Sequence, residues 1–155
     1  MKRYIDLPPV WLLGALIVAY VLRDFGPYLP LGPDFADGGH WGDLVGGIFV
    51  GGGVLLMLLA AMEMIQRKTT LDPHGESTTL VQSGIYKRSR NPIYVGDVLI
   101  LLGLILFWNV ALALPLVPLL VWILEKRFII PEERKLRMKF KAVYAAYERK
   151  TRRWV

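Results

Sequence analysis

The chain has 155 residues and a formal net charge of +6, and 54% of its residues are hydrophobic. Its length suits one domain, and its long apolar runs are typical of a membrane protein rather than a soluble one. The absence of cysteine excludes disulfides, thiolate metal sites and cysteine nucleophiles. His40 and His74 are far apart, so we expect no metal site, and the basic residues flank the apolar runs, which argues against a nucleic-acid partner.

Four apolar segments predict an all-α membrane protein with about four transmembrane helices in a single integral domain, residues 1–155. A helix that crosses a bilayer needs roughly 17–25 residues, and the second and fourth segments meet this length best. The predicted spans cover residues 9–25, 44–65, 92–108 and 110–130.

The first apolar segment follows Lys2 and Arg3, a pattern that would also suit a signal peptide. No small-residue cleavage site follows it, because Arg23, Asp24 and Phe25 come next. We therefore expect this segment to be retained as a helix.

The connecting segments differ in charge, which predicts the orientation. The segment after the first span is acidic, whereas the loop 66–91 and the chain beyond Lys126 are rich in Lys and Arg. An excess of Lys and Arg marks the cytoplasmic side, so the sequence predicts a multi-pass protein with this loop and both termini in the cytoplasm. An even number of spans gives the same result.

The third and fourth spans are separated by little more than Trp108 and Asn109, which predicts a tight antiparallel hairpin. Pro115 and Pro118 are expected to kink the fourth helix. The second span contains several glycines with GxxxG spacing, which favours close packing within one chain and leaves a homo-oligomer as the alternative. These glycines are Gly42, Gly46, Gly47, Gly51, Gly52 and Gly53.

Beyond Pro131, apolar residues recur at spacings of three and four, which predicts an amphipathic C-terminal helix over 131–150. One interpretation is a helix lying on anionic lipid. Glu132 and Glu133 at its start do not fit that interpretation. Together with the loop 66–91, this helix is predicted to form a cytosolic pocket.

The two cytosolic pieces supply acids, cations and aromatic rings, a set that suits a small zwitterionic ligand. Single residues also have structural interpretations: Lys87 and Arg88 as cytoplasmic anchors, and the two acids as helix N-terminal charges. Asp97 lies inside the third span, where an acid is a functional candidate. The candidate ligand residues are Tyr86, Arg90, Asn91, Tyr94, Glu132, Glu133, Tyr147 and Arg153.

The segment GIYKRSRNPIY, residues 84–94, resembles the G-x-Y-x-x-x-R-[HN]-P-x-Y pattern of a family of integral membrane methyltransferases. That family includes isoprenylcysteine carboxyl methyltransferase and bacterial phospholipid-methyltransferase-like proteins. The tail is similar to the family's E-E-x-x-L-x-x-x-F-x-x-x-Y-x-x-Y run, from Glu132 to Tyr147. The resemblance covers roughly residues 80–154, about half of the chain.

The resemblance implies S-adenosylmethionine as methyl donor, S-adenosylhomocysteine as product, and a lipophilic acceptor that enters from the bilayer. It implies catalytic roles for Arg90, Asn91 and Glu133, and substrate contacts for Arg90, Tyr147 and Arg153. The cofactor contacts that it implies are Leu80, Val81, Gly84, Tyr86, Asn91, Pro92, Tyr94, Glu132 and Glu133. No metal is implied.

Asn91 departs from the prenylcysteine enzymes, which have His at this position, and Asn cannot carry a charge. No histidine lies at a motif position to act as a base, which favours a carboxylate or thiolate acceptor over an amine that must first lose a proton. An isoprenoid carboxylate, a phospholipid amine and a small thiol all stay open as acceptors. The alternative to an enzyme resembling the isoprenylcysteine carboxyl O-methyltransferases is a non-catalytic membrane scaffold or lipid-binding protein with the same fold.

Overall fold

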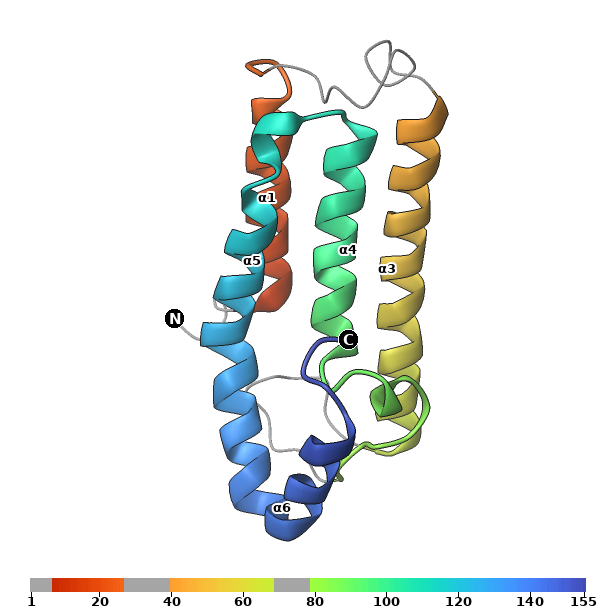
Figure 1. The fold of residues 1–155 in the computed structure, drawn as a ribbon, viewed down its shortest axis with the longest axis vertical. Helices are drawn as coiled ribbons and strands as arrows, with labels where there is room; N and C mark the ends of the chain where they lie inside the picture. Colours follow the sequence, from red (N-terminus) through yellow and green to blue (C-terminus); the bar gives the residue numbers. More distant parts are fainter. Residues whose placement is uncertain (1–6, 27–39, 69–78) are drawn as a thin grey trace.

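A computed structural model describes residues 7–26, 40–68 and 79–155, and these residues form a helical bundle (Figure 1). The described residues contain no strand, and their one β-bridge pairs Ser89 with Arg152. The prediction of an all-α fold is therefore confirmed. The helices of the bundle are α1 (Pro8–Leu22), α3 (His40–Gln66), α4 (Pro92–Phe107) and α5 (Leu116–Leu124).

Local sequence explains where α4 begins and ends. Pro92 occupies its first turn, where the missing N–H breaks no hydrogen bond. Asn109, with a φ of 55°, follows the last turn in the left-handed conformation that often ends helices. The chain then forms the short 3₁₀ turn η2 (Ala111–Ala113) before α5 starts, so the link is longer than the two residues predicted.

The fourth apolar segment differs from its prediction. Instead of one span over 110–130, α5 passes into a π-helical turn, η3 (Glu125–Ile129), and then into α6 (Ile130–Lys150). The expected kinks are also absent from the described helix interior. Pro115 caps α5 and Pro118 lies in its first turn, where its ring displaces no intrahelical hydrogen bond.

A sharp change of direction interrupts α6. Lys141 has φ 42° and ψ −116°, which no α-helix contains, and it divides the element into two helical pieces. In Figure 1 the chain turns at the foot of the bundle, and its C-terminus comes back to the base of α4. The predicted continuous helix 131–150 is thus wrong at this one position, which brings the last residues back to the loop before α4.

The apolar core lies between α1, α4 and α5, around Ala19, Leu101, Leu120 and Leu124. A second cluster joins Ala60 of α3 to the buried Val81 and Tyr86 of the loop. The first cluster includes Tyr94 at the start of α4, and the second holds the loop against α3.

Glycines let α3 and α4 approach closely. A Cβ atom added to Gly46 would lie 2.6 Å from the carbonyl oxygen of Gly103, and one added to Gly53 would lie 2.8 Å from that of Gly96. Gly51, in contrast, has nothing within 4 Å of an added Cβ. Gly46 and Gly53 therefore serve packing within the chain, as the sequence favoured, whereas Gly47 and Gly52, like Gly51, make no such contact.

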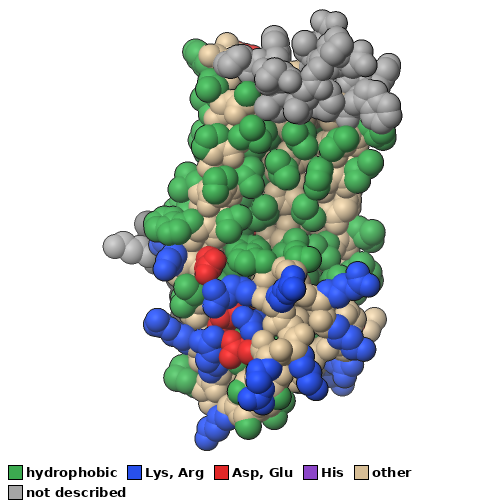
Figure 2. All heavy atoms as spheres, viewed as in Figure 1, with side chains coloured by type: hydrophobic (Ala, Val, Ile, Leu, Met, Phe, Trp, Pro, Cys, Tyr) green, Lys and Arg blue, Asp and Glu red, His purple; other side chains and the backbone are tan. Residues whose placement is uncertain are grey.

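On the face that Figure 2 shows, hydrophobic side chains cover most of the bundle, and Lys and Arg gather below it around α6 and the loop. Within the described residues, one helix is long and apolar enough to cross a membrane, Gly42–Gln66. The apolar helices Pro8–Leu22 and Pro92–Phe107 are shorter.

Candidate functional site

The two sequence patterns meet at the basic foot of the bundle. The backbone N–H of Arg90 donates to the carbonyl of Arg152 at 2.9 Å, beside the bridge between Ser89 and Arg152. The Nδ2 of Asn91 donates to the carbonyl of Arg153 at 3.0 Å. The end of the chain is thus held against the segment that leads into α4.

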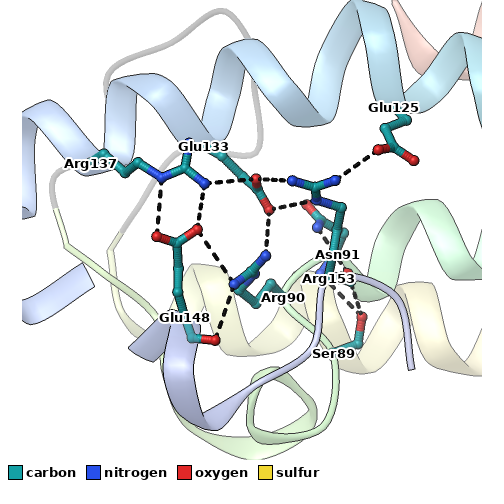
Figure 3. A network of polar contacts seen from close by, with 8 residues as sticks. All are labelled: Ser89, Arg90, Asn91, Glu125, Glu133, Arg137, Glu148 and Arg153. Atoms are coloured by element: carbon teal, nitrogen blue, oxygen red, sulfur yellow. Dashed lines mark hydrogen bonds and ion pairs between the residues drawn. The ribbon is translucent and has the colours of Figure 1, made fainter. Parts of the chain in front are cut away.

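Asn91 is buried and lies immediately before the first turn of α4. The following proline disfavours helical backbone at this residue, and Asn91 has φ −131° and ψ 55°. Its backbone N–H donates to the Oγ of Ser89 at 3.1 Å. Its side chain therefore contacts the C-terminal segment, as Figure 3 shows.

Glu133 is the centre of an ion-pair network (Figure 3), and its side chain is 3% exposed. Arg153 donates to both of its oxygens, from Nε at 3.1 Å and from Nη2 at 2.9 Å. Arg90 donates to Oε1 at 3.0 Å, and Arg137 lies 3.5 Å from Oε2. Such pairing offsets part of the free energy that the burial of a carboxylate costs.

Two further acids extend the network. Glu125 accepts from Nη1 of Arg153 at 2.7 Å, and Glu148 pairs with Arg137 at 2.6 Å and with Arg90 at 3.5 Å. Hydrogen bonding to Arg137 lowers the pKa of Glu148, and hydrogen bonding to Glu133 raises the pKa of Arg153. Three carboxylates thus face three guanidiniums, and the cluster is balanced in charge.

One buried donor in this cluster forms no hydrogen bond with a described residue. The Nε of Arg90 is buried and has no hydrogen-bond partner among the described residues. A buried donor of this kind is costly when it stays unpaired.

Tyrosines connect the loop, α4 and α6. The hydroxyl of Tyr147 donates to the carbonyl of Tyr86 at 2.6 Å, and burial raises the pKa of both phenols, which keeps them neutral. The hydroxyl of Tyr94 donates to Oε2 of Glu132 at 3.2 Å, and its ring stacks on that of Phe128.

The part of the loop at Ser83 and Gly84 contacts α3 and not the ion-pair network. Gly84 has φ 55°, and a Cβ added there would lie 2.5 Å from Oε2 of Glu63. Ser83 donates to Glu63, which also pairs with Arg67 at 3.6 Å in the i, i+4 arrangement. These contacts explain why Gly occupies position 84 of the pattern.

The structure brings four predicted site residues into one network: Arg90, Asn91, Glu133 and Arg153. The tyrosines and Glu132 lie around this network. Pro92 starts α4. Val81 packs with Tyr86 in the second cluster, and Leu80 directly precedes Val81. Sequence reasoning missed the partners Ser89, Glu125, Arg137 and Glu148. The motifs contained no signal for them, because each is recognised only by its distance to another segment.

A family model described as Phospholipid methyltransferase matches residues 41–143, which is more than half of the chain. The match runs from the start of α3 to the second part of α6 and includes the loop before α4. Neither the comparison with curated proteins nor that with solved structures found a match.

Proposed function

Because the chain belongs to the phospholipid methyltransferase family, we propose that it transfers a methyl group from S-adenosylmethionine to a lipophilic acceptor in the bilayer. One observation supports this most: the segments 84–94 and 132–153, which resemble the family's patterns, meet around Glu133. Because the two segments are far apart in sequence, their contact comes from the tertiary fold and not from local structure.

The residues at the foot of the bundle fit the donor's chemistry. The donor combines a carboxylate, an ammonium and a sulfonium with a flat base. The buried Nε of Arg90 suits the carboxylate, and Glu132 beside Tyr94 suits a cation. The rings of Tyr86 and Tyr94 offer apolar surface to the base.

Glu133 takes a different role in this proposal from the one that the resemblance implied. Its oxygens are already shared by three arginines, so it orients Arg90 and Arg153 instead of facing the donor's charge. Glu132 is then the better candidate for contact with the donor's cation.

The donor supplies an electrophilic methyl group attached to sulfur. Methyl transfer of this kind is an in-line displacement that depends on alignment and on the exclusion of water. The residues contribute to both: Arg90 and Asn91 are fixed by several hydrogen bonds, and the tyrosines are buried.

The same proposal includes the orientation in the membrane. Lys and Arg gather at the end of the bundle that holds the start of α4, the loop and α6 (Figure 2). We place this end in the cytoplasm because positive residues favour that side. The protein is then multi-pass, with both termini cytoplasmic and the donor site at the inner membrane surface.

Calorimetry in detergent tests the donor site. We expect S-adenosylmethionine to bind in the micromolar range typical of enzyme substrates, with S-adenosylhomocysteine as competitor. Glu132→Gln should weaken binding roughly tenfold, since a charged hydrogen bond contributes about 1.5–3 kcal/mol. Lys135→Gln, an exposed change one turn away, is the control.

Incubation with labelled donor and a membrane lipid extract tests transfer, with label in the lipid fraction as the expected result. If neither ligand binds and no lipid is labelled, the methyltransferase proposal fails. A non-catalytic scaffold or lipid-binding role then becomes the better account.

A further inference from the structure

Asp97 is a buried acid without a partner. Its side chain lies within α4, the residue is 1% exposed, and neither carboxylate oxygen accepts a hydrogen bond from any described residue. The other buried acid, Glu133, is bonded by three arginines, and the half-buried Glu63 is bonded by Ser83. Among the described residues, Glu133 and Glu63 are thus paired, whereas Asp97 is not.

Packing gives no reason for an acid at this position. Leu101, four residues further along the same face of α4, is fully buried in the apolar core, as is Ile105 one turn beyond it. An unpaired carboxylate among such residues destabilises the fold. An ionisable residue inside an apolar helix is a functional candidate for this reason.

Asp97 lies on α4 one helical turn from Tyr94, a residue of the candidate site. Tyr94 lies one turn nearer to the foot of the bundle on the same face of α4, and its hydroxyl contacts Glu132. Asp97 is thus about 4.5 Å deeper along the helix axis than Tyr94. For an acceptor to reach a donor beside Glu132 from the bilayer, its reactive group has to come to about this depth along α4.

Resting on the proposed function, we propose that Asp97 is a catalytic residue that takes the proton from an amine acceptor. An ammonium group first gives one proton to the carboxylate of Asp97, which frees the nitrogen lone pair. The lone pair then forms the bond to the donor's methyl carbon, while the carbon–sulfur bond breaks and its electron pair stays on sulfur. Asp97 becomes a neutral carboxyl group, and the methylated nitrogen carries the positive charge.

This proposal changes the expectation about the acceptor. The sequence lacks a histidine at a motif position, which favoured acceptors that need no base. A carboxylate can take the same role when it is buried and unpaired, and Asp97 meets both conditions.

Asp97→Asn tests the proposal, because it removes the charge and keeps the shape. The probe is a vesicle of phosphatidylethanolamine with labelled S-adenosylmethionine. We expect at least a roughly 100-fold loss of transfer, the lower bound for general-base catalysis, with unchanged donor affinity. The melting temperature should stay equal or rise, because an unpaired buried charge is removed. Asp43→Asn, at the exposed opposite end of α3, should change none of these.

Three results would overturn the proposal while the methyltransferase function stands. In the first, Asp97→Asn transfers methyl groups at the parent rate. In the second, it loses donor affinity and melting temperature together with activity, which indicates a structural role. In the third, alkali releases the label from the parent's product as volatile methanol, which a methyl ester yields and an N-methyl amine does not. A parent that binds no donor and labels nothing overturns both proposals.

Discussion

Arg153 binds Glu133 through two roughly parallel hydrogen bonds, 3.1 and 2.9 Å long, although twenty residues separate them. Glu133 is almost fully buried, whereas about a third of the Arg153 side chain is exposed. The pair connects the end of the chain to the first part of α6. A two-pronged contact of this kind fixes orientation as well as distance.

Glu133→Gln should lower the free energy of unfolding by about 1.5–3 kcal/mol, because Arg90 and Arg153 lose a charged acceptor. Denaturant unfolding in detergent measures this. Glu125→Gln removes one contact at a more exposed acid and should cost clearly less. Equal effects of the two variants would contradict the central place of Glu133.

Gly103→Ala should destabilise the protein by about 1–3 kcal/mol, since the new Cβ would lie 2.7 Å from the carbonyl oxygen of Gly46. Gly51→Ala is the matched control, because nothing lies within 4 Å of its added Cβ. There the helix propensity of Ala should leave stability unchanged or raise it by up to about 1 kcal/mol. Thermal unfolding distinguishes them. A Gly51→Ala variant that is the less stable of the two would disprove the proposed packing.

Lys141→Gly should raise the free energy of unfolding by about 1 kcal/mol, because the φ of 42° strains a residue with a Cβ. Lys139→Gly, in the regular part of α6, should instead lower it by about 1 kcal/mol. The comparison is made by thermal unfolding under identical conditions. If both variants lose stability equally, α6 is continuous in the membrane-bound protein.

The lowered pKa of Glu148 predicts that the free energy of unfolding depends on pH in the acidic range. Its pKa is lowered in the folded protein by the hydrogen bond from Arg137, so the folded state holds the proton less tightly than the unfolded state. The contribution is therefore present above the ordinary pKa of 4.5 and is lost as the pH falls through the lower folded value. Glu148→Gln and Arg137→Gln should both flatten the acid side of the stability profile. A profile as steep as the parent's in both variants would refute this pair's role.

The sequence predicted the parts of the fold that depend on local pattern. Apolar runs and Pro92 located α3 and α4 closely, since hydrophobicity and proline act within one helix. The turn at Lys141 could not be predicted, because no Gly or Pro marks it and α6 has helical periodicity on both sides. Tertiary contacts at Tyr147 and Glu148 accompany that turn instead.

The candidate site was likewise predictable only in part. The chemistry of their side chains and the family resemblance predicted that Arg90, Asn91, Glu133 and Arg153 belong to one site. Their actual partners were not predictable, because residue type alone does not say which of many arginines reaches a buried acid. Asp97 was identified as a candidate by its position in an apolar segment, and its lack of partners emerged only from the structure.

The hydrogen bonds from Arg90 and Asn91 to the carbonyls of Arg152 and Arg153 also bear on how the protein is made. Synthesis proceeds from the N-terminus, so α3 and α4 can associate through their glycines while the ribosome is still adding α5. The network around Glu133 needs Arg153, and it therefore closes only after nearly the whole described chain has been released. Until then the bundle can be assembled while the candidate site is still incomplete.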